Sequence, residues 1–407
     1  MNIQTKYRRL LAVLAAWALL AVLAVPARAE DAEIQATVTI STGVQGGQAE
    51  VAAPWDDGWF TEEAGTYRHE LALVSMALSG AAYLGGKDTG IQAALRQLGF
   101  GNITAYHYQR PAESADATAY TFAVKKLPGG GRLAAIVVRG TGQATEWTSN
   151  LNMGPGGEHT GFAGARDELL GNLRSYLAGL GLDGEAGRDL KFLITGHSRG
   201  GAVANLTAAR LSDEGEVYAY TFASPTVASG GEGKIYPHIF NIVNEEDLVT
   251  QVPLAGWGWY RYGVDLLLPA EERLGEEDYA ALFDKMDRRY TGMTGQPYAR
   301  YQNAKAVEEM TCAIQGMLPS VSAGGTAMLS ALLRGDLDGL AGLVEENSLL
   351  ALALGRRMLA LSSDLTPLMQ QEARGMVSAH CMAGYYSWLS VCGEEAEALF
   401  QAASAST

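Results

Sequence analysis

Basic residues are scarce in this chain: 30 lysines and arginines stand against 45 aspartates and glutamates, a net charge of −15 over 407 residues. A protein this acidic is repelled by phosphate backbones and by anionic lipid surfaces, which excludes nucleic-acid binding. A transient contact with a lipid interface is possible, and apolar groups must then drive it. No obligate protein partner is evident in the sequence.

Cysteine is also rare, with only Cys312, Cys381 and Cys392. If residues 382–392 form one helix, a rise of 1.5 Å per residue separates Cys381 from Cys392 by about 16 Å, too far for a disulfide. A bridge from Cys312 to one of them is then the favoured pairing in an oxidising compartment. Three buried thiols are the alternative.

The N-terminus has the pattern of an export signal. Three basic residues within positions 6–9 precede an apolar run over 10–25, and small residues then allow cleavage after Ala29. The run is short for a membrane span and no stop-transfer segment follows it, although an uncleaved anchor is the alternative. Removing residues 1–29 takes away four basic residues and no acidic one, so the secreted protein would carry a net charge of −19.

Apolar strands alternate with helices through the middle of the chain. That order is typical of an α/β fold in which helices cover a mostly parallel sheet, here of the α/β-hydrolase kind. Strands are expected at 34–40, 120–124, 133–138, 190–195, 217–222 and 239–243, and helices at 67–84 and 161–180 and directly after Ser198.

The chain divides by texture into five parts. A signal peptide over 1–29 precedes an N-terminal segment over 30–66 that packs on the core, and the hydrolase core covers 67–265. No convincing strand follows from Glu271 to about Met376, so 266–375 is expected to be a helical insertion, which could shape a binding cleft or only flank the core. Residues 376–407 then complete the hydrolase domain.

The sequence Gly196-His197-Ser198-Arg199-Gly200 lies between an apolar strand and a helix. This is the context of a nucleophile elbow, whose turn is so tight that only glycine fits on either side of the serine. The turn lifts the serine hydroxyl above the sheet edge, with helix N-terminal N–H groups beside it. Ser198 is therefore the candidate nucleophile.

The base and the acid follow from chain order, which in this fold runs serine, acid, histidine. Of the six histidines, only His380 lies beyond both the elbow and a credible acid, where a loop is expected to enter the last helix. The acid is expected at the end of the strand over 239–243. Asp247 is favoured there, since Leu248 and Val249 follow it, while Glu245 and Glu246 are interpreted as solvated charges.

An oxyanion hole needs two N–H donors. The N–H of Arg199, directly after the nucleophile, is the first. Thr141, in the glycine turn after the strand over 133–138, is the candidate for the second, with an ordinary turn threonine as the alternative.

These motifs together resemble the class 3 (fungal-type) lipase family. The shared features, in order and spacing over about 120–255, are Arg139-Gly140-Thr141, Trp147, His159-Thr160-Gly161-Phe162, the elbow, Thr221-Phe222-Ala223-Ser224-Pro225 and Asn241 to Asp247. The resemblance implies a Ser198–Asp247–His380 triad, an oxyanion role for Thr141, and a short lid over 142–150 with Trp147 as its hydrophobic residue. It also implies that His159 is structural. The chain departs from the family in the long insertion between acid and histidine and in the polar composition of the lid.

We therefore expect a bacterial-type, exported serine carboxylic ester hydrolase of the triacylglycerol lipase or carboxylesterase kind, acting on acylglycerols through an acyl-enzyme. This chemistry requires no metal and no organic cofactor. A phospholipase A1 or a short-chain esterase is the nearest alternative. A non-catalytic lipid-binding protein that keeps the fold is the alternative from a different class.

Overall fold

The computed structural model describes residues 34–85, 90–108, 118–141, 157–183, 189–230, 236–253, 258–300 and 374–393. At the centre of these residues is a seven-stranded sheet with the order β11-β9-β7-β6-β5-β4-β3. Strands β5, β6, β7, β9 and β11 are parallel, while β4 is antiparallel to both of its neighbours. This mostly parallel sheet confirms the predicted fold class. The strands are β3 (Gly101–Tyr106), β4 (Tyr120–Lys126), β5 (Arg132–Val138), β6 (Leu190–His197), β7 (Glu216–Phe222), β9 (Ile239–Val243) and β11 (Val264–Leu267).

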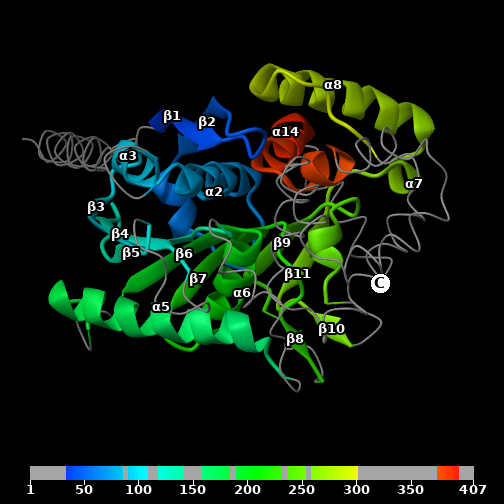
Figure 1. Cartoon of the computed structure of the whole chain (residues 1–407). Helices are drawn as coiled ribbons and strands as arrows, with labels where there is room; N and C mark the ends of the chain where they lie inside the picture. The colour runs from blue at the N-terminus through cyan, green and yellow to red at the C-terminus, as the bar shows by residue number, and fades with distance from the viewer. Residues whose placement is uncertain are drawn as a thin grey trace, which may run out of the picture.

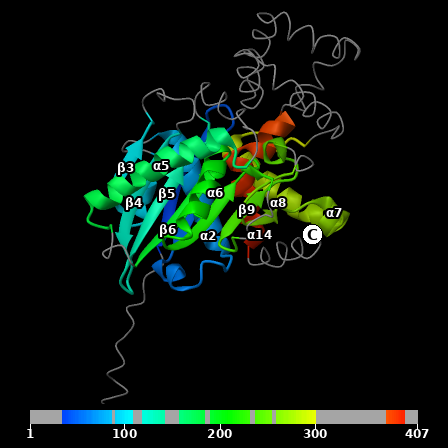
Figure 2. The ribbon, with the colours of Figure 1, turned by 90° about the horizontal axis from the view of Figure 1, so that it is seen from below.

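The parallel strands are apolar along their whole length because both faces of the sheet are covered. Every residue of β9 is buried, as is every residue of β5 and β7 except the first. Helices α5 (Thr160–Gly179) and α6 (Arg199–Leu211) cover one face (Figure 2). Their apolar side chains, such as Phe162 and Leu169, share one hydrophobic cluster with the strands.

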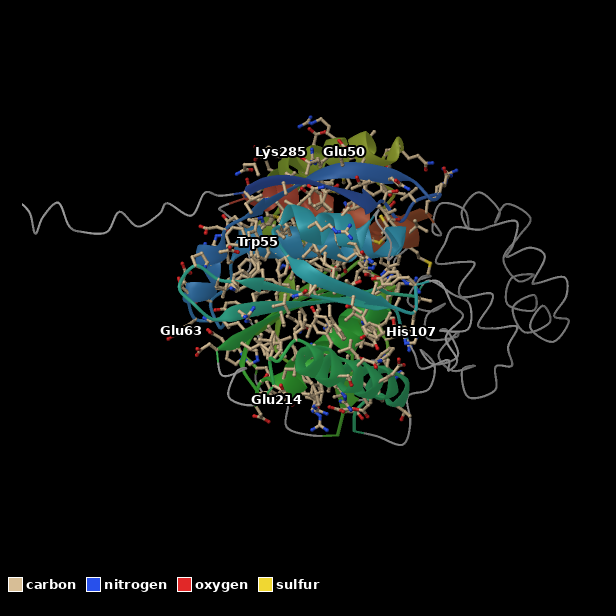
Figure 3. All side chains as sticks on the ribbon, turned by 90° about the vertical axis from the view of Figure 1, so that its left-hand side faces the viewer. Glu50, Trp55, Glu63, His107, Glu214 and Lys285 are labelled. Atoms are coloured by element: carbon tan, nitrogen blue, oxygen red, sulfur yellow. The ribbon has the colours of Figure 1, made fainter. Side chains whose placement is uncertain are left out.

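The opposite face is covered by segments from both ends of the described chain (Figure 1). Helix α2 (His69–Ala81) lies against the sheet, and a hairpin of β1 (Ile34–Ser41) and β2 (Gln48–Trp55) packs over α2. Seen from the side, Glu50 of the hairpin and Lys285 lie above the sheet, while Glu214 lies below it (Figure 3). The strand expected over 34–40 is therefore present in β1, and β2 is an element that was not predicted.

Most of the described chain after the sheet is helical. Helices α7 (Glu271–Leu274) and α8 (Glu276–Thr294) follow β11, and α14 (Met382–Cys392) packs against α8 and α2. The predicted start of the insertion at residue 266 was wrong, because β11 pairs with β9 through Leu267. Residues 301–373, which contain Cys312, lie outside the described residues, as do the signal peptide and the lid candidate Trp147.

Smaller elements connect these layers. None of the described helices is long and apolar enough to span a membrane. The remaining elements are η1 (Asp57–Thr61), η2 (Ala82–Leu84), α3 (Ile91–Gln97), η4 (Leu248–Gln251) and the two-stranded pair of β8 (Ala228–Ser229) and β10 (Trp259–Tyr260).

Candidate active site

Ser198 lies in the turn between β6 and α6, in a strained backbone conformation with φ 59° and ψ −131°. Such a conformation costs a non-glycine residue about 1–3 kcal/mol, so the surroundings must hold it. The Ser198 N–H donates to the Phe222 carbonyl at 2.9 Å, which anchors the turn to β7. The turn lies at the C-terminal end of β6, and Ser198 is partly exposed.

The glycines beside the serine have no room for a side chain. A Cβ built on Gly196 would lie 2.3 Å from the Gly200 carbonyl oxygen, and one on Gly200 would lie 2.3 Å from the Val138 carbonyl oxygen. Real Cβ atoms do not approach backbone so closely. The turn therefore has the tight packing expected of a nucleophile elbow.

His380 brings the nucleophile and the acid together. Its Nε2 lies 3.0 Å from Ser198 Oγ, and its Nδ1 lies 2.8 Å from Oδ2 and 3.0 Å from Oδ1 of Asp247. These are hydrogen-bonding distances, in the order nucleophile, base, acid. The imidazole is 14% exposed and the carboxylate 1%, so water has little access to their contact.

The local structure around His380 differs from the expectation in one respect. A loop was predicted before the last helix, and this was wrong. Residues 374–380 are helical, Cys381 breaks the helix, and α14 begins at Met382. The thiol of Cys381 accepts from the Gly384 N–H at 3.4 Å, which caps α14. His380 therefore lies at the C-terminus of one helix and just before the N-terminus of another.

Three groups hold the carboxylate of Asp247: the Val249 N–H, the Tyr385 hydroxyl and the His380 imidazole. Its Oδ1 accepts from the Val249 N–H at 3.0 Å, which makes Asp247 the N-cap of η4. Its Oδ2 accepts from the Tyr385 hydroxyl at 2.9 Å as well as from His380. The two competing carboxylates lie elsewhere: Glu245 pairs with Arg273, and Glu246 pairs with Arg300.

Tyr385 is a site residue that the sequence did not reveal. Its ring is fully buried, and burial together with the Asp247 carboxylate raises the pKa of its hydroxyl well above the usual value. The hydroxyl therefore stays protonated and donates to Asp247, while it accepts from the Asn244 N–H at 3.1 Å. Only its position, five residues after His380, hinted at a role.

Of the two oxyanion candidates, Arg199 belongs to the elbow and Thr141 lies in a turn beside it. Arg199 is the first residue of α6, and Thr141 directly follows the glycine turn at the end of β5. The two segments pack closely, because a Cβ on Gly140 would lie 2.6 Å from the His197 carbonyl oxygen. The structure therefore brings the Gly140–Thr141 turn against the nucleophile elbow, where N–H donors are needed.

The other histidines make contacts that do not involve Ser198. The ring of His197 is buried, and this burial, with His380 nearby, lowers its pKa well below the usual 6.5. Nor do the described residues contain a group of three or more His, Cys, Asp or Glu arranged to hold a metal ion. The other four histidines also have partners: Leu389 for His69, Glu168 for His107, Phe162 for His159 and Ser212 for His238.

Comparison with known proteins finds a similarity in the middle of the chain. Residues 135–257 match the family model described as lipase (class 3). This match supports the resemblance drawn from the motifs over residues 135–257. The segment contains Ser198 and Asp247 and ends before His380, so the base lies in a part of the chain that the family model does not cover.

The chain is also similar to curated and solved proteins over part of its length. The chain is 36% identical over 103 residues to "Secreted mono- and diacylglycerol lipase 1" of Fusarium solani, which covers 23% of this chain and 30% of that relative's length. The Rhizomucor miehei triacylglyceride lipase structure is 20% identical, with a TM-score of 0.37, and covers 50% of this chain and 80% of that one. The structure of the mono- and diacylglycerol lipase from Aspergillus oryzae is 18% identical, with a TM-score of 0.36, and covers 50% of this chain and 81% of that one.

Proposed function

We propose that the protein is an exported serine carboxylic ester hydrolase, a lipase that acts on acylglycerols. The observation that carries the proposal is the continuous chain of hydrogen bonds from Ser198 through His380 to Asp247, at 3.0 and 2.8 Å. The three residues come from separate elements, so their meeting at one sheet edge is a product of the fold. A strained elbow and a buried carboxylate support the same conclusion.

In the proposed mechanism each residue has one step. Ser198 Oγ attacks the ester carbonyl carbon while His380 Nε2 takes the hydroxyl proton, and Asp247 stabilises the imidazolium through Nδ1–H. The N–H groups of Thr141 and Arg199 hold the oxyanion. His380 then gives the proton to the departing alcohol, which leaves an acyl-enzyme on Ser198. A water molecule loses a proton to His380 and attacks the acyl carbon; His380 then returns that proton to Ser198 Oγ as the acyl–oxygen bond breaks, which releases the carboxylic acid and restores the serine hydroxyl.

The class of substrate rests on the family match. The matched segment carries the nucleophile, and the curated relative is described as a lipase of mono- and diacylglycerols. That relative is also described as secreted, which agrees with the export signal expected over 1–29. We therefore propose neutral acylglycerols as substrates of this chain in the extracellular space.

A substrate panel with one variant tests the proposal. Purified wild-type protein and Ser198→Ala are compared on emulsified mono-, di- and triacylglycerol, on phosphatidylcholine vesicles and on soluble p-nitrophenyl esters of increasing acyl length. The proposal predicts fatty-acid release from acylglycerols by the wild type and a loss of about 10⁴-fold or more in Ser198→Ala. Release from phosphatidylcholine alone would instead indicate a phospholipase A1. Activity restricted to short soluble esters would indicate an esterase.

A non-catalytic protein that binds lipid through the same fold makes a different prediction. It would bind vesicles or emulsions, but wild type and Ser198→Ala would release equal, background amounts of fatty acid. That result would reject the proposed function.

A further inference from the structure

The helix over residues 374–380 ends at the proposed base, and its end carbonyls need partners from outside the helix. The last four carbonyl groups of any α-helix lack an intrahelical donor. Here the Ala379 carbonyl accepts from Asn244 Nδ2 at 3.1 Å, and the His380 carbonyl accepts from His197 Nε2 at 2.7 Å. The two side chains that cap this helix therefore come from the loop of the acid and from the nucleophile elbow.

The tautomer of His197 fixes it as the donor to the His380 carbonyl. Its Nε2 faces a carbonyl oxygen, which can only accept, so the proton lies on Nε2. Its Nδ1 then accepts from the Tyr83 hydroxyl at 3.1 Å. Burial lowers the pKa of the ring, which keeps it neutral and keeps both hydrogen bonds in this direction. His197 is thus a fixed donor one residue before Ser198.

Asn244 is equally fixed. Its Oδ1 accepts from the Glu246 N–H at 3.1 Å, which leaves Nδ2 to donate to Ala379 and to the Tyr298 hydroxyl. The residue is 7% exposed, so water does not compete well for these groups. Asn244 is thus a second fixed donor, three residues before Asp247.

His380 is far along the sequence from both of its partners in the triad. It lies 133 positions after Asp247 and 182 after Ser198. Its position must therefore be set by contacts between segments, and a displacement of about 1 Å at such a site can cost about a hundredfold in rate. His197 and Asn244 hold the main chain of His380 and Ala379, so they oppose a displacement of the His380 imidazole.

We propose that His197 and Asn244 are positioning residues that hold the main chain of His380 in register with Ser198 and Asp247. This inference rests on the proposed function of the triad. Each residue donates to the carbonyl of residue 379 or 380, and the His197 ring also packs with its centroid 4.9 Å from that of the His380 ring. Neither residue hydrogen-bonds to the Ser198 hydroxyl or to the His380 imidazole. Their loss should slow the chemical steps and leave substrate binding unchanged.

Two substitutions of His197 separate its hydrogen bond from its bulk. In His197→Gln the amide nitrogen reaches the place of Nε2 and keeps the donor, whereas in His197→Asn the shorter side chain cannot reach the His380 carbonyl. We expect kcat for a soluble ester to fall about 10–100-fold in His197→Asn with KM unchanged, and to stay within about threefold of wild type in His197→Gln. His238→Asn removes a bond to Ser212 at the other end of α6 and is the control, with unchanged kcat.

Asn244→Asp tests the second contact. The substitution keeps the size of the side chain but replaces the donor to Ala379 with an oxygen, so kcat should again fall about tenfold or more at constant KM. Asn172→Asp is the matched control, because Asn172 donates to the Tyr120 hydroxyl at 2.6 Å and takes no part in the site. Melting temperatures of all variants show which of them are folded.

The outcomes are distinct. Equal kcat in His197→Asn and wild type, or equal losses in His197→Asn and His197→Gln, would overturn the positioning role of His197. If His197→Asn does not fold, Asn244→Asp decides the inference, and an unchanged kcat in that variant overturns it. Wild type and Ser198→Ala in the same assay test the proposed function separately. If that function is wrong, these two proteins hydrolyse the ester at the same rate.

Discussion

The hydroxyl of Tyr385 donates to Oδ2 of Asp247 at 2.9 Å, the same oxygen that faces Nδ1 of His380 at 2.8 Å. One carboxylate oxygen is therefore held by two side chains of the same C-terminal segment. This arrangement orients the carboxylate toward the imidazole, because rotation about the Asp247 side chain would break both contacts.

Removing this hydroxyl should weaken the acid without disturbing the nucleophile. In Tyr385→Phe we expect kcat to fall about tenfold, since a lost hydrogen bond to a charged group is worth about 1.5 kcal/mol or more. Tyr386→Phe is the matched control, because Tyr386 is equally buried and donates to the Ala52 carbonyl at 2.8 Å. Steady-state kinetics with a soluble ester compare the two, and equal kcat values would contradict a role for Tyr385 at Asp247.

The tight packing of the elbow predicts the effect of added side chains. In Gly200→Ala the new Cβ would lie 2.3 Å from the Val138 carbonyl oxygen, so the free energy of unfolding should fall by about 3 kcal/mol or more. Gly171→Ala, inside α5 with nothing within 4 Å, should instead gain up to about 1 kcal/mol. Urea denaturation measures both. Similar free energies of unfolding for the two variants would contradict the prediction and show that the turn can accommodate a Cβ.

Arg261 should stabilise the loop of the acid. Its guanidinium donates to the carbonyls of Thr250 and Ser224 at 2.7 and 3.0 Å and pairs with Asp265. Lysine cannot reproduce this fork, so Arg261→Lys should lower the free energy of unfolding by about 2 kcal/mol. Arg174→Lys changes an exposed pair and should stay within about 0.5 kcal/mol. Equal stability of both variants in denaturant titrations would contradict this role.

The buried ring of His197 predicts a dependence of stability on pH. In the unfolded chain the ring takes up a proton near its ordinary pKa of 6.5, whereas in the folded protein the lowered pKa keeps it neutral. Its contribution to stability is therefore fully present above pH 6.5. Below that pH it is lost at about 1.4 kcal/mol per pH unit, until the folded-state pKa is reached.

His197→Gln has no titrating ring and isolates this contribution. Its free energy of unfolding should fall less steeply than that of wild type as the pH drops from about 6.5 to about 5, where other groups titrate alike in both proteins. Urea titrations at several pH values measure the two slopes. Identical slopes would show that His197 takes up a proton as readily in the folded protein as in the unfolded chain.

Local sequence patterns were sufficient where the chain makes its own structure. Alternating apolar strands and helices predicted the core sheet, and the glycine spacing around Ser198 predicted the strand–turn–helix of the elbow. Chain order restricted the base to His380, which the structure places 3.0 Å from Ser198 Oγ. These predictions depend on the local periodicity of apolar residues and on the backbone freedom of glycine.

Contacts between distant segments could not be predicted in the same way. Strand β2 pairs with β1, yet its sequence is rich in alanine and has little strand character of its own. Tyr385, Asn244 and His197 become site residues only when the helix over 374–380 docks on the sheet. Nothing in their local sequence shows which carbonyl or carboxylate they will meet.

Labelling by a fluorophosphonate probe tests most directly whether Ser198 is a nucleophile activated by His380. The probe forms a stable bond only with an activated serine, and peptide mass spectrometry locates the modified residue. We predict stoichiometric labelling of the wild type on Ser198, none in Ser198→Ala, and a rate lower by about 10³-fold or more in His380→Gln. Labelling of Ser198→Ala at the wild-type rate, or an unchanged rate in His380→Gln, would contradict the proposed triad.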